Sequence, residues 1–234
     1  MQLGAMVRRA RQRVVARSVA RSSLVRNASF RLGWVSTRRL DPLSEWGFER
    51  GTPIDRYYIE RFLRAHRGLV RGRVLEVRED LYASGLGADT VDVLDIDVTN
   101  PLATVVGDVC DPTTLPRGAF DCGIITQTLQ LVPDPRAALQ NLLASVRPGG
   151  SILVTVPSMS RLAGSWDRWR WTAHGFEDLV DVTGGVGEVR AFGNLVTCRA
   201  FLLGAAVEEL PRRVLERDDP ELPLIVTAVV RPKG

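Results

Sequence analysis

Residues 120–157, FDCGIITQTLQLVPDPRAALQNLLASVRPGGSILVTVP, hold two short apolar runs with a helical pattern between them. Asp134 stands where a helix N-cap is expected, and the turn at 148–150 ends the helical pattern. Apolar runs of this kind are typical of strands buried on both faces, and a helical crossover makes the two strands it joins parallel. The stretch therefore predicts a strand–helix–strand unit of an α/β fold.

The same alternation of apolar runs and helical patterns continues on both sides of this unit. Strands are expected at 73–77, 90–96, 103–107, 120–126, 151–156, 187–192 and 222–230, and further helices at 54–66, 175–182 and 195–210. We therefore predict a doubly wound, mostly parallel seven-stranded sheet, a Rossmann-like α/β arrangement preceded by an N-terminal helical extension.

Composition narrows the class of protein. The 234 residues suit one α/β domain with an extension, and 45% hydrophobic with 25% charged residues is the balance of a soluble globular protein. The three cysteines form no CxxC pair and only two histidines are present, so we expect no metal site and no disulfide framework. Neither a membrane span nor a secretion signal is visible, which makes the reducing cytoplasm the expected compartment.

Charge is unevenly distributed along the chain. Residues 1–40 contain ten arginines and no acid, and residues 6–26 read as a basic amphipathic helix. We expect 1–50 to be a basic extension and linker, and 51–234 to be the main domain. The basic helix could pack on its own domain or on a partner subunit, or contact an anionic membrane surface or nucleic acid. We favour packing, because no aromatic residue in 6–26 could stack on bases.

Acidic and polar residues follow the expected strands. In an open parallel sheet, ligands bind beyond the carboxyl ends of the strands. Asp95, at the end of VLDID, could accept hydrogen bonds from both ribose hydroxyls of a nucleoside, with Asp92 and Asp97 as competitors. Asp108 could accept from an adenine amine while the Val109 amide donates to the ring. The alternatives are solvated or capping aspartates, with Asp108 only making a turn.

Taken in order, VLEV, VLDID, GDVCDPTTLP, FDCGIITQ, VPDP and RPGG resemble the class I S-adenosylmethionine-dependent methyltransferases, especially the type 11 group. The resemblance covers residues 52–234 and implies S-adenosylmethionine as the cofactor. It places the following residues at the cofactor: Glu76 and Val77 at the end of the first strand, Asp95 at the ribose, Asp108 and Val109 at adenine, Gln127 beneath the methionine part, and Tyr57 on a covering helix. Tyr57 could equally be a packing aromatic.

Two features depart from this family. Arg78 and Asp80 stand where the first two glycines of the turn after the first strand are expected, so side chains could fill the methionine pocket. The segment 97–103, DVTNPLA, is too short for the usual helix between the second and third strands. We expect a short crossover there.

The resulting hypothesis is methyl transfer to a small molecule, such as O-methylation of a sugar or specialised metabolite. His174 and Asp167 are the candidate bases for a hydroxyl acceptor, although a histidine beside a helix start can equally be a cap or packing residue. Trp166, Trp169, Trp171 and Phe176 could line an acceptor pocket or cover the sheet. The alternatives are a non-catalytic binding or scaffold protein, and a cofactor-retaining fold that catalyses another reaction such as a cyclisation. An oligomer is compatible with all three.

Overall fold

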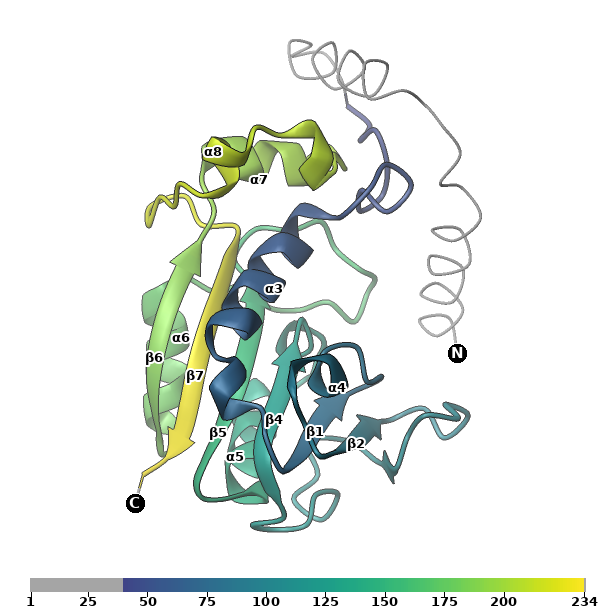
Figure 1. Ribbon diagram of the computed structural model, residues 1–234, viewed down its shortest axis with the longest axis vertical. Coiled ribbons are helices and arrows are strands. Elements are labelled where there is room, and N and C mark those ends of the chain that lie inside the picture. The colour runs from purple at the N-terminus through teal and green to yellow at the C-terminus, as the bar shows by residue number, and fades with distance from the viewer. Residues whose placement is uncertain (1–39, 234) are drawn as a thin grey trace. The chain divides into compact units, whose positions relative to one another are not determined.

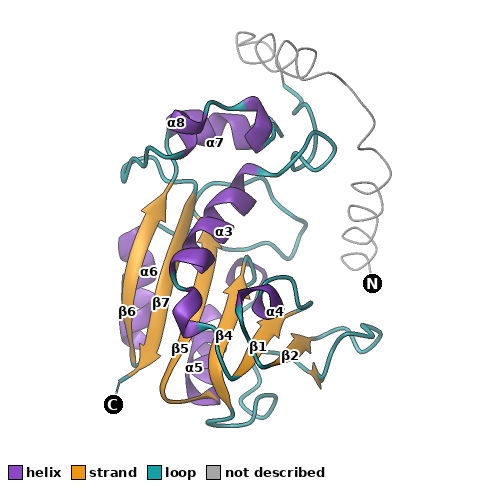
Figure 2. Cartoon of the chain, viewed as in Figure 1, coloured by secondary structure: helices purple, strands orange, loops and turns teal. Residues whose placement is uncertain are grey.

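The computed structural model describes residues 40–233 (Figures 1 and 2). The described chain forms two compact units. The larger unit contains residues 59–158, 162–191 and 225–233, and the smaller unit contains 40–58, 159–161 and 192–224. The helix expected over 6–26 and most of the extension 1–50 lie outside the described residues.

A seven-stranded sheet forms the larger unit, in the order β3-β2-β1-β4-β5-β7-β6. Its strands are β1 (Arg73–Val77), β2 (Thr90–Asp95), β3 (Val105–Val106), β4 (Phe120–Thr126), β5 (Val146–Pro157), β6 (Gly185–Phe192) and β7 (Ile225–Pro232). The pairs β3–β2, β2–β1, β1–β4 and β4–β5 are parallel, and β7 runs antiparallel to β5. The predicted mostly parallel sheet is therefore confirmed.

Helices cover both faces of this sheet (Figure 1). On one face lie α5 (Pro135–Ser145) and α6 (Ala173–Val182). On the other lies the C-terminal half of α3 (Ile54–Ala65), and the short α4 (Ala83–Leu86) follows β1. Single 3-10 turns occur at Arg67–Leu69 and Leu129–Leu131. This is the doubly wound arrangement that the sequence predicts.

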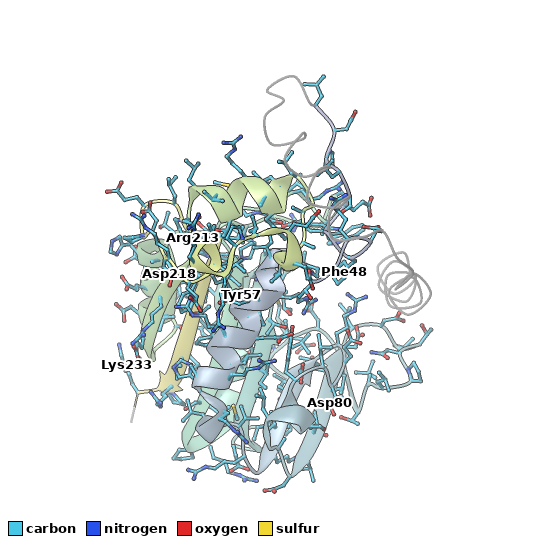
Figure 3. The ribbon with its side chains drawn as sticks, turned by 45° about the horizontal axis from the view of Figure 1, so that its top comes forward. Phe48, Tyr57, Asp80, Arg213, Asp218 and Lys233 are labelled. Carbon is cyan, nitrogen blue, oxygen red and sulfur yellow. The ribbon has the colours of Figure 1, made fainter. Side chains whose placement is uncertain are left out.

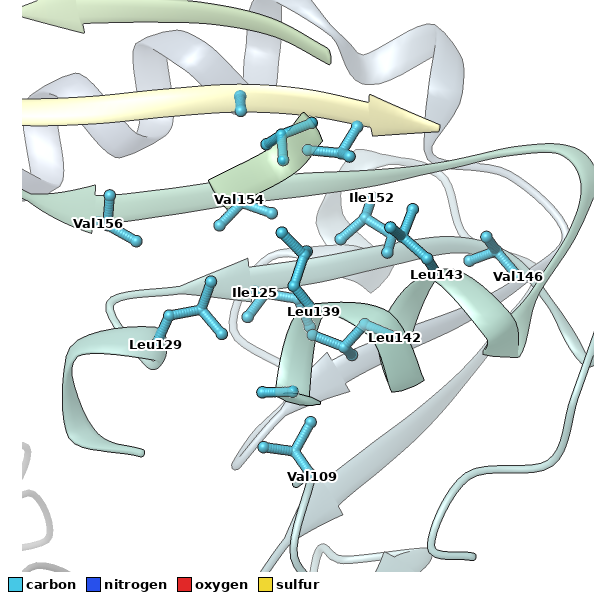
Figure 4. Packing of buried hydrophobic residues seen from close by; sticks show 14 of the residues in the cluster. Val109, Ile125, Leu129, Leu139, Leu142, Leu143, Val146, Ile152, Val154 and Val156 are labelled. Atoms are coloured by element: carbon cyan, nitrogen blue, oxygen red, sulfur yellow. The ribbon is translucent and has the colours of Figure 1, made fainter. Parts of the chain in front are cut away.

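The helix α5 shows why this sequence folds as expected. The Asp134 side chain accepts from the amides of Arg136 and Ala137, both at 3.0 Å, which caps the helix start. Leu139 and Leu142 are fully buried against the sheet (Figure 4). Burying a leucine side chain stabilises a fold by roughly 1.5–3 kcal/mol, so this face fixes the helix on the sheet.

The crossover between β2 and β3 contains no helix. Residues 96–104 form turns only, and β3 is limited to Val105–Val106 rather than 103–107. The short crossover expected from DVTNPLA is therefore confirmed. By contrast, β5 begins earlier than expected, at Val146, with a register irregularity between Phe120 and Cys122 of β4.

The smaller unit holds α7 (Leu195–Leu202), a 3-10 turn at Val207–Glu209 and α8 (Arg212–Leu215). Asn194 and Thr197 form a capping box at the start of α7. The prediction of one helix over 195–210 is wrong beyond Leu202. Gly204 has φ +70°, and a Cβ there would lie 2.0 Å from the Ser44 carbonyl oxygen, so the chain leaves the helix at this glycine.

Among residues 40–233, no helix is long and apolar enough to cross a membrane. The same residues contain no group of three side chains that could hold a metal ion.

Candidate active site

The parallel strands β1, β2 and β4 end at the same edge of the larger unit's sheet. Glu76, Asp95 and Gln127 lie at or just beyond these ends, and Asp108 follows β3. The topology therefore brings the candidates that follow these strands to one edge, whereas Asp167 and His174 belong to the segment after β5. The packing of each one determines what it can do.

Glu76 is buried, with 2% of its surface exposed, and its carboxylate holds the loop that follows β1. It accepts from the backbone amides of Leu81 at 3.1 Å, Tyr82 at 3.2 Å and Ala83 at 2.8 Å. Burial raises the pKa of Glu76 to about 7, although the three amide donors act in the opposite direction. The orienting role that the resemblance implies for the loop is thus visible as three hydrogen bonds. Val77, the next residue, is half-buried and packs against the hydrophobic core.

The loop after β1 has a glycine-like backbone although its glycines are absent. Arg78 has φ +78°, in the left-handed region that glycine adopts without strain, and its amide donates to the Leu94 carbonyl at 2.7 Å. The Asp80 side chain lies at the start of α4, where it accepts from the Ser84 amide at 3.0 Å and from the Ser84 hydroxyl (Figure 3). The Asp80 carboxylate therefore stabilises the start of α4.

Asp95 is held by its own crossover loop. One carboxylate oxygen, Oδ1, accepts from the Asp97 amide at 3.0 Å. The other, Oδ2, accepts from the side-chain amide of Asn100 at 2.7 Å, and the same Asn100 nitrogen donates to the Arg78 carbonyl at 2.7 Å. Asn100 thereby connects the ends of β1 and β2. Sequence reasoning missed it, and the only signal was the turn-forming Asn-Pro pair close behind an acid.

Asp108 and Val109 form a turn after β3. The Asp108 carboxylate accepts from the Cys110 amide at 2.8 Å, so the turn-making interpretation describes this side chain. The Val109 side chain is buried in the core, and its carbonyl accepts from Asn141 at 2.9 Å. The Val109 amide donates to no other residue within 40–233. That leaves one backbone donor available at the position expected to meet adenine.

Gln127 is the second non-glycine residue with a positive φ, at +48°. Its amide donates to the Thr155 carbonyl at 2.9 Å, and its carbonyl accepts from the Gln130 side chain at 2.9 Å. The side-chain amide of Gln127 has no hydrogen-bond partner in the described chain. A half-buried amide with both functions unused can donate to or accept from a ligand.

The segment after β5 is tied to the turn that follows β4. The Arg168 amide donates to the Gln130 carbonyl at 2.8 Å, and the Trp169 indole donates to the Val132 carbonyl at 3.0 Å. Of the other aromatic candidates, Trp171 is buried and packs edge-on against Phe176, with the rings 5.9 Å apart. Trp171 therefore acts as a covering residue of the sheet, whereas Trp169 is 40% exposed.

The two candidate bases have different surroundings. The Asp167 carboxylate pairs with both terminal nitrogens of Arg170, at 2.5 and 2.9 Å, and accepts from the Ala163 amide at 2.9 Å. The His174 side chain is 94% exposed in the first turn of α6, and its Nδ1 lies 3.0 Å from the Glu177 carboxylate. The structure therefore does not bring His174 and Asp167 into contact.

Tyr57, the remaining candidate, lies on α3 (Figure 3) and belongs to the smaller unit. Its ring lies edge-on to Tyr58, with 5.2 Å between the ring centroids, and Tyr58 stacks on Phe192. A contact of Tyr57 with a cofactor stays a prediction.

Sequence comparison identifies the family. Residues 38–183 match the model of a protein family whose description is "Methyltransferase domain". The chain belongs to this family. Its class I members use S-adenosylmethionine as their cofactor, as the motif order around Asp95 and Asp108 implied. No curated protein matches this methyltransferase-family chain significantly by sequence.

Solved structures share the fold at low sequence identity. The [4+2]-cyclase SpnF is 18% identical, with a TM-score of 0.54 over 79% of this chain and 85% of its own. A methyltransferase from Mesorhizobium loti is 15% identical, with a TM-score of 0.53 over 76% and 97%. A DhpI–SAM–HEP complex is 15% identical, with a TM-score of 0.52 over 90% and 94%. These similarities establish the methyltransferase fold.

The donor set at the strand ends fits S-adenosylmethionine in most respects. The Val109 amide and the Gln127 side chain have unused hydrogen-bonding capacity, and Arg78 has the positive φ that a glycine adopts easily. The exposed Ile96, beside Asp95, offers an apolar surface. The carboxylates are already engaged: Asp97 and Asn100 each donate to one oxygen of Asp95, and the Cys110 amide donates to Asp108.

Proposed function

We propose that this chain transfers a methyl group from S-adenosylmethionine to a hydroxyl group of a small molecule. The observation that carries the proposal is the left-handed backbone of Arg78 together with the anchoring of its loop by Glu76. Contacts with Leu94 and Asn100 hold this strained non-glycine conformation, which costs of order 1–3 kcal/mol, and strain of this kind collects at functional sites.

Each residue at the strand ends has a distinct part in this proposal. Asp95 would hold the ribose hydroxyls, the Val109 amide with Asp108 would contact adenine, and Gln127 would meet the methionine part. When bound, the cofactor supplies a methyl group activated on a sulfonium. The chain contributes mainly by orienting the reactants, which lowers the entropic part of the barrier without acid–base groups of unusual pKa.

For the acceptor side, we propose His174 as the base that takes the hydroxyl proton. Its imidazole is exposed and accessible to an acceptor, and Glu177 can orient the ring. Asp167 is better explained as the residue that holds the segment 163–170, because its two carboxylate oxygens bind Arg170 and Ala163. The partly exposed Trp169 would form one wall for a flat or sugar-like acceptor.

Titration calorimetry of the full chain with S-adenosylmethionine and S-adenosylhomocysteine tests the proposal. We expect binding of both by the natural chain and a large loss of affinity in Asp95→Ala. Asp111→Ala is the matched control, because Asp111 is an exposed turn aspartate that binds only Thr113 and the backbone of its own turn. The absence of heat with both ligands would contradict the proposal and favour a non-catalytic binding protein.

A second candidate function is a cofactor-retaining fold that catalyses a cyclisation. The similarity to the [4+2]-cyclase SpnF supports this candidate, although it extends to the fold alone. The two functions separate in an assay with a radiolabelled methyl donor and a panel of hydroxylated acceptors. Transfer of label supports methylation, whereas binding of cofactor without transfer to any acceptor favours the second candidate.

A further inference from the structure

The Asn100 side chain uses all of its hydrogen-bonding groups at the exits of β1 and β2. Its amide nitrogen donates to Asp95 Oδ2 and to the Arg78 carbonyl, each at 2.7 Å. Its amide oxygen accepts from the Leu102 amide at 3.1 Å. A side-chain amide has two N–H donors, and both are used here. The Asn100 side chain is therefore fully hydrogen-bonded in this position.

These contacts overlap with what a ribose needs. A ribose diol binds a carboxylate by donating one hydroxyl to each oxygen. Here each Asp95 oxygen already accepts one bond from the chain, from Asp97 at 3.0 Å and from Asn100 at 2.7 Å. The Asp97 donor is a backbone amide in the tight turn after β2 and can stay in place. The Asn100 donor fills one of the two lone-pair positions of Asp95 Oδ2, and because it is a side chain it can be displaced.

We propose that Asn100 is an affinity-setting residue that competes with the cofactor's ribose for Asp95. The inference rests on the proposed function, because it concerns the same site. According to this proposal, the Asn100 side chain of the short crossover loop occupies the ribose position beside Asp95 in the free protein. Binding of the cofactor replaces the Asn100–Asp95 bond by bonds from the ribose hydroxyls, and the energy of the lost bond lowers the apparent affinity.

The crossover loop is built to release Asn100 without disturbing the sheet. Val98 is 78% exposed and Leu102 is 51% exposed, so the loop buries little apolar surface. Apart from the two bonds of the Asn100 side-chain nitrogen, the bonds around residues 97–100 are local: Asp97 accepts from the Thr99 amide at 2.9 Å, and the Asn100 amide donates to the Asp97 carbonyl at 3.0 Å. Segments with few buried apolar contacts open at low free-energy cost.

If Asn100 had the opposite role, removal of its side chain would change the cofactor affinity in the opposite direction. If Asn100 instead donates to the bound ribose, its removal weakens binding. If it competes, its removal strengthens binding. Hydrogen bonds to charged groups are among the stronger ones in proteins, so we expect Asn100→Ala to lower the dissociation constant for S-adenosylmethionine by about tenfold.

The experiment is titration calorimetry of the full chain with S-adenosylmethionine, using the natural sequence and four variants. Asn100→Ala is the test, and Thr99→Ala is the matched loop control, because Thr99 binds Asp97 but not Asp95. Asp95→Ala and the double variant Asp95→Ala/Asn100→Ala complete a double-mutant cycle. Thermal unfolding of each variant establishes that the protein is folded.

Tighter binding by Asn100→Ala, no change in Thr99→Ala and no effect of Asn100→Ala in the Asp95→Ala background would support the inference. Unchanged or weaker binding by a folded Asn100→Ala chain would overturn the inference and leave the proposed function intact, provided that the natural chain binds. Binding by Asn100→Ala but not by the natural chain would support both the inference and the proposed function. The absence of binding by every variant would overturn both.

Discussion

Arg78 and Gln127 are the only non-glycine residues within 40–233 that have a positive φ. Both lie directly after strands that end at the same edge of the sheet, β1 and β4. Strained backbone of this kind collects at functional sites, where surrounding contacts enforce it. At Arg78 the enforcing contacts are its own amide on Leu94 and its carbonyl on Asn100.

Replacing Arg78 with glycine is expected to stabilise the protein. Glycine adopts φ +78° without steric cost, whereas a Cβ in the left-handed region costs about 1–2 kcal/mol. We expect Arg78→Gly to raise the free energy of unfolding by about 1 kcal/mol in urea denaturation. Arg78→Ala is the control, because it removes the guanidinium but keeps the Cβ. Equal stability of the two variants would show that backbone strain at this position is not relieved by glycine.

Glu76 gives the stability of the protein a distinctive dependence on pH. Its pKa rises from 4.5 to about 7 on folding, because burial disfavours the charged carboxylate. The folded protein therefore keeps a proton that the unfolded chain releases. The stability that this proton provides is fully present below pH 4.5 and is lost as the pH rises through 7.

The non-titrating variant Glu76→Gln isolates this effect. We expect the natural chain's stability, measured relative to Glu76→Gln, to fall between pH 4.5 and pH 7. The fall should not exceed roughly 3 kcal/mol, since one pKa unit corresponds to about 1.4 kcal/mol. Urea denaturation of both proteins at several pH values provides the measurement. A difference that stays constant with pH would show that Glu76 titrates near its ordinary pKa.

Among the elements, those with a local signal were predicted from the sequence. The helix α5 has its cap and its apolar face within residues 134–145, and the strands β1 and β4 are short, mainly apolar runs. The end of α7 was not predicted, because the requirement for Gly204 comes from Ser44, 160 residues earlier in the chain. Here a distant contact decided where the helix ends.

The residues of the candidate site also differ in whether a local sequence signal points to them. Glu76 and Asp95 can be proposed from the motifs, because each stands at or near the end of its own strand. Asn100 was not identified, because its bond to Arg78 joins residues 22 apart and exists only when β1 and β2 are paired. The left-handed backbone of Arg78 was also missed, since an arginine gives no signal for it.

The segment after β5 allows a structural acid to be separated from a catalytic base. Asp167→Asn removes the charge that binds Arg170, and we expect it to lower the free energy of unfolding by about 2 kcal/mol. His174→Ala should leave stability unchanged, because its side chain is 94% exposed, but should lower kcat for a hydroxyl acceptor about 100-fold.

Thermal unfolding and methyl-transfer kinetics measure the two effects. The affinity for S-adenosylmethionine is the internal control, and we expect it to be unchanged in His174→Ala. Full activity of His174→Ala would assign proton removal to another group or to water. A stable but inactive Asp167→Asn chain would return Asp167 to the catalytic candidates.

Over the whole molecule, charge is distributed very unevenly along the chain. Residues 1–39 contain ten arginines and no acid, so a total of +4 leaves −6 on the rest of the chain. The residues proposed to bind the cofactor, apart from Tyr57, fall within 76–127. The basic segment and the cofactor-binding residues are therefore separate in sequence, and their contributions can be tested apart.

A chain that lacks residues 1–39 is expected to bind S-adenosylmethionine with an unchanged Kd in calorimetry, because the bonds around Asp95, Val109 and Gln127 all lie within 40–233.

We also expect neither the full nor the shortened chain to bind anionic vesicles or a single-stranded oligonucleotide at 0.15 M salt. A basic stripe without stacking aromatics gives weak, strongly screened attraction at about this ionic strength. Retention of the full chain alone on either surface would assign the segment a membrane or nucleic-acid contact, and a weaker Kd in the shortened chain would place it at the cofactor site.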